Sequence, residues 1–221
     1  RLIMGVDFSW LLQAFSAPEP ADNRRWIVLD VETSGLDPHR DQLLAIAAVA
    51  VHRRDSQSRP QISAADSFEA VIRQESASTK PNILVHGIGA GAQRSGDDPG
   101  TVMRDLRAWI GQAPLFAFHA PFDEALIQRW AKHHLGRKLP NLWLDLAPLC
   151  RAAFPTVKAR SLDQWLAHFG LECAVRHQAA ADAFVTAELL LKIWGALGRD
   201  GQEIYALHTL ANRSRWLARL D

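Results

Sequence analysis

Two acidic residues, Asp30 and Glu32, stand two positions apart at the end of the apolar run 26–32. Side chains two positions apart on an extended strand point to the same face, so both carboxylates leave that face together. The same face carries Trp26 and Val28, which we expect to be buried. Two carboxylates crowded at the end of a core strand repel one another and lose hydration, which a hard divalent cation relieves. The pair predicts a metal site, although an isolated Asp-x-Glu is more often a solvated turn.

A third acid, Asp123, follows an expected strand at 114–118 and the residues Pro121 and Phe122. Proline suits the first position of a helix, so this order predicts a helix with Asp123 in its first turn. The helix dipole stabilises an acid there, and Asp123 taken alone is therefore most simply a helix cap.

His177 and Asp182 enclose a run of mostly small residues at 178–181. Five helical steps of about 100° place two side chains about 140° apart, so these two cannot converge if both are helical. They can converge if His177 lies in a loop and Asp182 points inward from the first turn of the following helix. The alanines between them let that helix approach a sheet closely. Taken alone, a histidine ahead of a helix is more often a cap or a surface residue than a base.

Hydrophobic periodicity and turn residues define the elements that must position these side chains. Three closely spaced strands, at 26–32, 43–52 and 66–73, predict antiparallel neighbours, because parallel ones need a longer crossover. Residues 53–61 are expected to form a turn and 74–100 a loop. Helices and strands then alternate along the chain: helix 101–111, strand 114–118, helix 121–135, strand 141–145, and helices 161–169, 178–197 and 201–219. The expected α/β fold is a mixed five-stranded sheet flanked by helices.

The ends of the chain are expected to lie outside the main domain. Phe8, Leu11, Leu12 and Phe15 recur at helical spacing and predict a short amphipathic helix near 7–16, followed by a linker rich in proline and alanine. The expected division is a helix and linker at 1–23, a main domain at 24–200, and a C-terminal helix at 201–221 packed on or extending that domain.

The composition excludes few classes of protein. The 221 residues carry 25 Lys and Arg against 24 Asp and Glu, a net charge of +1 that leaves room for a local basic patch. Gathering several acids into one site makes the remaining surface more basic. Cys150 and Cys173 give no disulfide framework, so a reducing, cytoplasmic location is expected. No apolar stretch approaches the ~20 residues that span a membrane, so no membrane partner is expected.

Four segments together resemble the motifs of the DEDDh family of exonucleases. These segments are Asp30-x-Glu32-Thr33-Ser34-Gly35-Leu36, His86-Gly87-Ile88, Pro121-Phe122-Asp123 and His177-x-Ala179-x-x-Asp182. Each motif is weak alone, but all four occur in the family's order over about 26–194. The resemblance implies a ribonuclease-H-like fold and 3′→5′ exonuclease activity, similar to that of the proofreading epsilon subunit of bacterial DNA polymerase III and of ribonuclease T.

The same resemblance implies roles for individual residues. The four acids Asp30, Glu32, Asp123 and Asp182 would hold two divalent cations, Mg²⁺ or Mn²⁺. Two such ions ~3.5–4 Å apart clamp the in-line displacement at a phosphodiester. His177 would be the general base, because an unperturbed histidine pKa of ~6.5 suits proton transfer near neutrality.

The turn after the first strand would hold the 3′-terminal nucleotide. Its residues are Thr33, Ser34, Gly35 and Leu36, with Leu36 against the last base. Phe122 and His86 are further substrate-binding candidates, although a core position is as good an assignment for Phe122. Ala120 stands where the family commonly has Asn, and 89–91 replaces an expected capping Thr. We expect both departures to affect substrate preference more than activity.

The leading interpretation is a metal-dependent 3′→5′ exonuclease that releases nucleoside 5′-monophosphates, acting on DNA in proofreading or repair. One alternative is an exoribonuclease that trims RNA ends, because the catalytic core does not itself distinguish the sugars. A non-enzymatic alternative is a nuclease-like module that docks on a polymerase; the stripe at 8–15 and the arginines at 213–219 support it weakly. A structural protein with incidental acids requires five coincidences. The expected partners are a DNA or RNA 3′ end and a polymerase or other replication or repair protein, and the oligomeric state stays open.

Overall fold

The computed structural model describes residues 24–54, 58–197 and 204–217. The helix expected near 7–16 lies outside these ranges, and so do the side chains of residues 213–219. Among the described residues, every helix is too short or too polar to cross a lipid bilayer.

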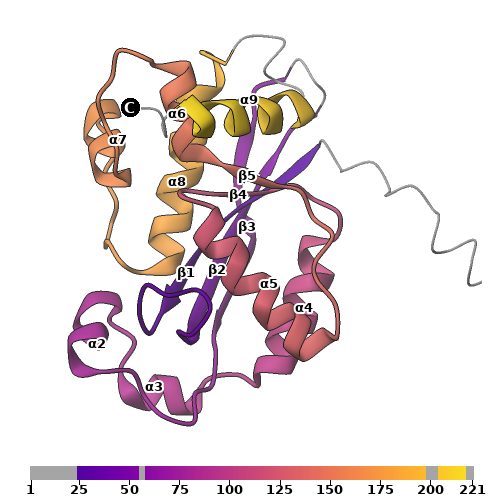
Figure 1. Cartoon of the computed structure of the whole chain (residues 1–221), viewed down its shortest axis with the longest axis vertical. Coiled ribbons are helices and arrows are strands. Elements are labelled where there is room, and N and C mark those ends of the chain that lie inside the picture. Colours follow the sequence, from indigo (N-terminus) through magenta and orange to yellow (C-terminus); the bar gives the residue numbers. More distant parts are fainter. Residues whose placement is uncertain (1–23, 55–57, 198–203, 218–221) are drawn as a thin grey trace, which may run out of the picture.

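A five-stranded sheet forms the centre of the fold, with the strand order β3-β2-β1-β4-β5 (Figure 1). The strands are β1 (Arg25–Thr33), β2 (Leu43–His52), β3 (Gln61–Val71), β4 (Leu115–Ala117) and β5 (Trp143–Asp145). β1 pairs with β2, and β2 with β3, in antiparallel fashion, whereas β1 with β4 and β4 with β5 are parallel. The predicted mixed sheet with three antiparallel strands first is confirmed.

Helices cover both faces of the sheet (Figure 1). One face carries α4 (Pro99–Ile110) and α5 (Pro121–Leu135). The other carries α6 (Leu146–Ala153), α7 (Leu162–Phe169), α8 (Ala179–Trp194) and α9 (Ile204–Leu217). α5 occupies the range predicted from its proline start and its periodicity.

Alternate residues of β1 belong to two separate cores. Ile27 and Leu29 pack with the α4 and α5 side, whereas Trp26 and Val28 pack with the α8 side. All four are at most 1% exposed, so the expected burial of Trp26 and Val28 is confirmed. This alternation continues to the end of the strand and assigns Asp30 and Glu32 to the α8 side.

Two expectations for the connecting segments are wrong, and one helix was not expected. β3 begins at Gln61, because a register shift at Val49/Ala50 lets the strand pair further along β2. The expected loop at 74–100 contains two short helices, α2 (Lys80–His86) and α3 (Ala90–Ser95). α6 was not anticipated at all; it starts where the Asp145 carboxylate accepts a hydrogen bond from the backbone N–H of Ala147.

The C-terminal helix contributes to the α8-side core. Ile204, Leu207 and Ala211 of α9 are buried there, and α9 lies against α6 and β5. This packing joins residues beyond 200 to the sheet. The boundaries of the three expected segments stay a prediction.

Candidate active site

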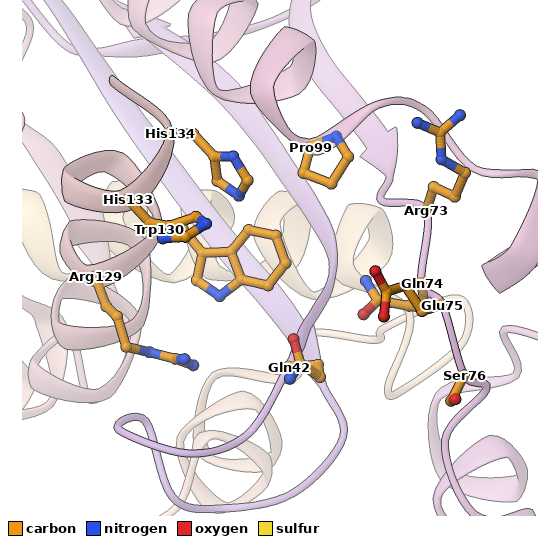
Figure 2. A pocket seen from close by; sticks show the side chains of 10 residues that line it. All are labelled: Gln42, Arg73, Gln74, Glu75, Ser76, Pro99, Arg129, Trp130, His133 and His134. Carbon is orange, nitrogen blue, oxygen red and sulfur yellow. The ribbon is translucent and has the colours of Figure 1, made fainter. Parts of the chain in front are cut away.

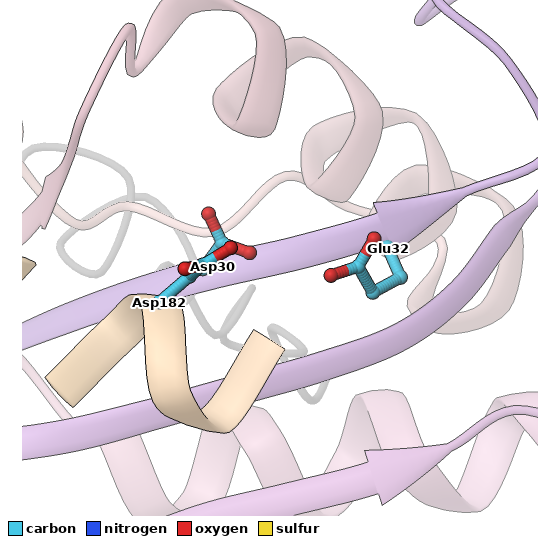
Figure 3. A group of neighbouring side chains, drawn as sticks. All are labelled: Asp30, Glu32 and Asp182. Carbon is cyan, nitrogen blue, oxygen red and sulfur yellow. The ribbon is translucent and has the colours of Figure 1, made fainter. Parts of the chain in front are cut away.

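Three carboxylates converge over the end of β1, two from the strand and one from α8 (Figure 3). Asp30, Glu32 and Asp182 each present an oxygen, and these oxygens lie within 4.8 Å of one another. α8 packs directly on β1 and β2, which brings Asp182 to the strand. The residues opposite Asp30 and Glu32 on β2 are Ala47 and Ala45. Their small side chains leave space beside the acids on that face.

Asp182 also holds the loop that precedes α8. It lies in the first turn of the helix and is 4% exposed. Its carboxylate accepts hydrogen bonds from the Arg176 guanidinium, from the Cys173 thiol at 3.4 Å, and from the backbone N–H of His177 at 2.9 Å. His177 is therefore in the loop and Asp182 points inward from the helix, which is the arrangement that the sequence spacing requires for the two to approach. The His177 side chain is exposed.

Asp123 comes from a different helix, α5. It lies in the first turn of α5, with Pro121 at the start of the helix as predicted, and is 5% exposed. It stands outside the three converging oxygens. Burial raises the pKa of both Asp30 and Asp123; the Asp123 charge raises that of Asp30 further, and Asp145 and Glu32 raise that of Asp123 further. All four predicted acids are thus brought to the same end of the sheet.

A fifth acid, Asp145, was missed by the sequence reasoning. It ends β5, is 5% exposed, and is an electrostatic neighbour of Asp123. Its carboxylate accepts a hydrogen bond of 3.0 Å from the backbone N–H of His119, a residue with φ of 63° in the turn before α5. Asp145 therefore shapes the turn that carries Asp123. The available signal was an acid at the end of an expected strand.

The converging carboxylates disfavour one another's ionisation, although Asp30 and Glu32 keep part of their surface open to solvent. Burial raises the pKa of Glu32 to about 7; the Asp182 carboxylate adds to the rise and Arg176 opposes it. Burial also raises the pKa of Asp30 well above its usual range, and the neighbouring carboxylates of Asp123, Glu32 and Asp182 raise it further. Crowded carboxylate oxygens of this kind suit a hard divalent cation, so the donor set fits Mg²⁺ or Mn²⁺.

The turn after β1 is held in one shape by its own side chains. A bulge between Glu32 and Thr33 ends the regular pairing, and the Thr33 hydroxyl donates to the Gly35 carbonyl at 2.6 Å. The Ser34 hydroxyl donates to Asp41 at 3.0 Å. A Cβ added to Gly35 would lie 2.5 Å from an oxygen of Asp41, so only glycine fits here without a shift. Leu36 projects from the turn and is 91% exposed.

The two remaining substrate-binding candidates, Phe122 and His86, are less exposed than Leu36. Phe122 is half-buried beside Asp123 at the start of α5. The His86 ring is 2% exposed; its Nδ1 accepts from the backbone N–H of Ile88, and its Nε2 contacts Asn82 Oδ1 at 2.9 Å. Asn82 in turn donates to the Thr33 carbonyl at 2.9 Å. His86 thus supports the residue that holds the end of β1.

Both departures from the family pattern fall at helix starts. Ala120 precedes α5 and Gly89 precedes α3, and neither helix start has a side-chain cap. Neither change replaces one of the four acids or His177.

Comparison with known proteins identifies the family of the chain. The RNase_T family model, described as an exonuclease, matches residues 27–190. The DNA polymerase III PolC-type protein of Bacillus subtilis is 31% identical over 173 residues, covering 78% of this chain and 12% of that protein. A DNA polymerase III subunit epsilon-like protein of Rhodobacter capsulatus is 28% identical over 190 residues, covering 84% of this chain and 26% of that protein. The chain therefore spans about a quarter or less of the length of these two relatives.

The fold also matches solved nuclease structures. Exonuclease I of E. coli, crystallised with a dT13 oligonucleotide, aligns with a TM-score of 0.65 at 16% identity, covering 79% of this chain and 42% of that one. The expected ribonuclease-H-like fold and the resemblance to exonucleases are both confirmed. The chain belongs to the RNase_T family of exonucleases.

Proposed function

We propose that this chain is a metal-dependent 3′→5′ exonuclease that hydrolyses the last phosphodiester bond of a strand and releases a nucleoside 5′-monophosphate. The observation that carries the proposal is the convergence of oxygens from Asp30, Glu32 and Asp182 within 4.8 Å of one another. Buried Asp123 adds a fourth acid from a different helix. Divalent cations would relieve the mutual repulsion of such a set, which is drawn from three distant parts of the chain.

The residues would divide the chemistry among them. Asp30, Glu32, Asp123 and Asp182 would hold two divalent cations, which when bound supply an activated water and stabilisation of the leaving oxyanion. His177 would take the proton from the attacking water. Its exposed side chain in the loop beside Asp182 is free to approach a substrate at the end of β1.

The turn after β1 would bind the 3′-terminal nucleotide. Backbone groups at Thr33–Gly35 would face the terminal sugar and phosphate, and Leu36 would lie against the last base. Phe122 would line the same pocket from α5. We assign His86 an indirect role, holding Asn82 and through it Thr33, because its ring is 2% exposed.

DNA is the substrate we favour. The relatives include proteins named as DNA polymerase III PolC-type and subunit epsilon-like, and Exonuclease I was solved with a DNA oligonucleotide. From the same similarity we propose that the chain works in the cytoplasm alongside a polymerase or another replication or repair protein. The exonuclease unit would comprise residues 24–200, with 1–23 and 201–221 as attached segments.

A side-by-side digestion tests this proposal. Matched DNA and RNA single strands, and a primer with a paired or mispaired 3′ end, are incubated with Mg²⁺, with Mn²⁺ and with chelator. We expect metal-dependent digestion that is faster on DNA and faster at the mispaired end. Faster digestion of RNA would favour the exoribonuclease, and no digestion with either metal would favour the binding module.

A further inference from the structure

Two adjoining hollows lie on the α4 and α5 face of the molecule, apart from the carboxylate site. The first is about 650 Å³ in volume (Figure 2). Its lining residues come from the turn before β2, the segment after β3, the start of α4 and the second half of α5; they include Gln42, Arg73, Pro99, Arg129, Trp130 and His134.

The first hollow begins at the proposed substrate turn. Gln42 lines it, and the backbone of Gln42 exchanges hydrogen bonds of 3.0 and 2.9 Å with Ser34. Arg129, also in the lining, donates to the carbonyl oxygens of Pro38 and Asp41. Gln42 and Arg129 therefore both hold the 34–42 turn and line the first hollow.

The second hollow is about 540 Å³ in volume and strongly basic. Arg104 and Arg107 reach it from α4, and Arg137 and Lys138 from the segment after α5. Its described lining residues include no acid. All four cations are exposed. The cations face solvent at one concave place, where their fields add.

The two hollows meet at the start of α4. A Cβ built on Gly100 would lie 3.9 Å from His134 Nδ1 and 3.3 Å from Arg104 Nη1. His134 lines the first hollow and Arg104 the second. His134 and Arg104 thus bring the two hollows close together at the first turn of α4, and we treat them as one candidate path from the 34–42 turn to Lys138.

The chemistry changes along this path. In the first hollow, the rings of Trp130 and His134 lie side by side, with centroids 5.3 Å apart (Figure 2). Its charges nearly balance, since Glu75 also lines it and Arg73 pairs with Asp98 at 3.1 Å. Trp130 is 8% exposed and packs in the core, so the first hollow offers mainly the half-buried His134 ring to a nucleobase. The cations of the second hollow suit phosphates.

We infer that this path binds the single-stranded part of a nucleic acid whose 3′ end occupies the carboxylate site. The inference rests on the proposed function and extends it with a second contact region. The charge of the second hollow supports it, because four exposed cations line it and none of its described lining residues is an acid. A strand that crosses the 34–42 turn would reach the first hollow at Gln42.

Charge reversal in the second hollow tests the inference without requiring turnover. Binding of a single strand of about 30 nucleotides is measured by fluorescence anisotropy with chelator present, over a range of salt, for the full chain and for Arg107→Glu/Arg137→Glu. Loss of two phosphate contacts should weaken binding about tenfold and make the slope of log affinity against log salt shallower by about 1.4. Arg107→Gln/Arg137→Gln should weaken binding less, and thermal unfolding checks that both variants fold.

A matched control and a short ligand sharpen the result. Lys158→Glu/Arg160→Glu reverses two exposed cations between α6 and α7, on the other face, and should leave binding unchanged. A strand of about 5 nucleotides is too short to extend from the carboxylate site to the second hollow. It should bind the two charge-reversal variants as tightly as it binds the parent chain. Equal effects of the two reversals, or equal weakening of short and long strands, would overturn the inference. Because binding is read with no reaction, a failure to digest any substrate would count against the proposed function alone.

Discussion

The backbone N–H of His177 donates a hydrogen bond of 2.9 Å to Oδ2 of Asp182. The acid that completes the carboxylate cluster thus also determines where the histidine stands. His177 adopts a φ of 62°, a region that asparagine enters more readily than most residues. The imidazole can therefore be removed while the loop and its bond to Asp182 are kept.

His177→Asn should separate proton transfer from the structure of the site. The side chain loses its basic nitrogen, but the backbone conformation and the bond to Asp182 remain. We expect turnover to fall about 10²–10⁴-fold, the usual loss for a general base, with little change in the Mg²⁺ concentration that gives half-maximal stabilisation. Single-turnover kinetics and thermal shift measure the two effects. Turnover within a few-fold of the parent chain would remove the base assignment.

The metal-free chain should become less stable as the pH rises. Burial and the Asp182 carboxylate raise the pKa of Glu32 from its ordinary 4.5 to about 7, so the folded chain holds a proton that the unfolded chain releases. The stabilisation is complete below about pH 4.5 and is lost as the pH rises through about 7. We expect a loss of roughly 1–3 kcal/mol.

Denaturant unfolding with chelator at about pH 5.5 and about pH 8 measures this loss. Glu32→Gln should flatten the profile, and Mg²⁺ should restore the stability of the parent chain at the higher pH, because the metal binds the ionised acids of the folded state. If the free energy of unfolding of the metal-free chain rose with pH instead, that result would contradict the crowding of the acids.

Gly35→Ala should disturb the turn after β1. The added Cβ would lie 2.5 Å from Asp41 Oδ2, and Asp41 cannot easily move because it accepts hydrogen bonds from Ser34 and from the backbone N–H of Asp37. We expect a loss of about 1 kcal/mol in stability. We also expect KM to rise more than kcat falls. Gly91→Ala is the matched control, since a Cβ there meets nothing within 4 Å. Equal kinetics for the two variants would show that the turn does not bind substrate.

The ion pair between Arg25 of β1 and Asp66 of β3 should stabilise the folded chain, and this stabilisation should be lost at low pH. Asp66 accepts two hydrogen bonds of 2.8 Å from Arg25 and one of 2.9 Å from His52, and these lower its pKa to about 2. The stabilisation is present above about pH 4 and is lost as the pH falls through about 2. After allowance for solvent screening it should amount to roughly 1 kcal/mol.

Acid unfolding of Asp66→Asn checks this contribution. The variant should lose less stability between about pH 4 and about pH 2 than the parent chain does. Asp105→Asn changes an exposed acid on α4 and serves as the control. A parallel decline of the variant and the parent chain would show that the pair adds nothing.

The sequence predicts best what depends on local patterns. Alternation along 26–32 places Trp26 and Val28 in the core and both acids on one face, because the strand period is fixed by the backbone. Pro121 marks the start of α5 for an equally local reason.

Features that depend on distant contacts were not predictable in this way. α2 and α3 have seven and six residues, and side-chain hydrogen bonds tie each helix to residues outside it, for example Gln93 of α3 to Ser78 and Asn82 of α2 to the Thr33 carbonyl. Asp145 reaches the turn before α5 only because β5 pairs with β4, opposite Ala117. No spacing in the sequence encodes that pairing. The bond between Arg176 and Asp182 likewise depends on the path of the loop.

A digestion ladder tests the central claim most directly. A 5′-labelled single strand of DNA is incubated with the parent chain and with Asp182→Asn, each with Mg²⁺ and with chelator. The parent chain with Mg²⁺ should shorten the strand one nucleotide at a time from its 3′ end, and the other three reactions should leave it intact. A ladder that survives the chelator, or that Asp182→Asn still produces at the parent rate, would contradict a site built on these carboxylates.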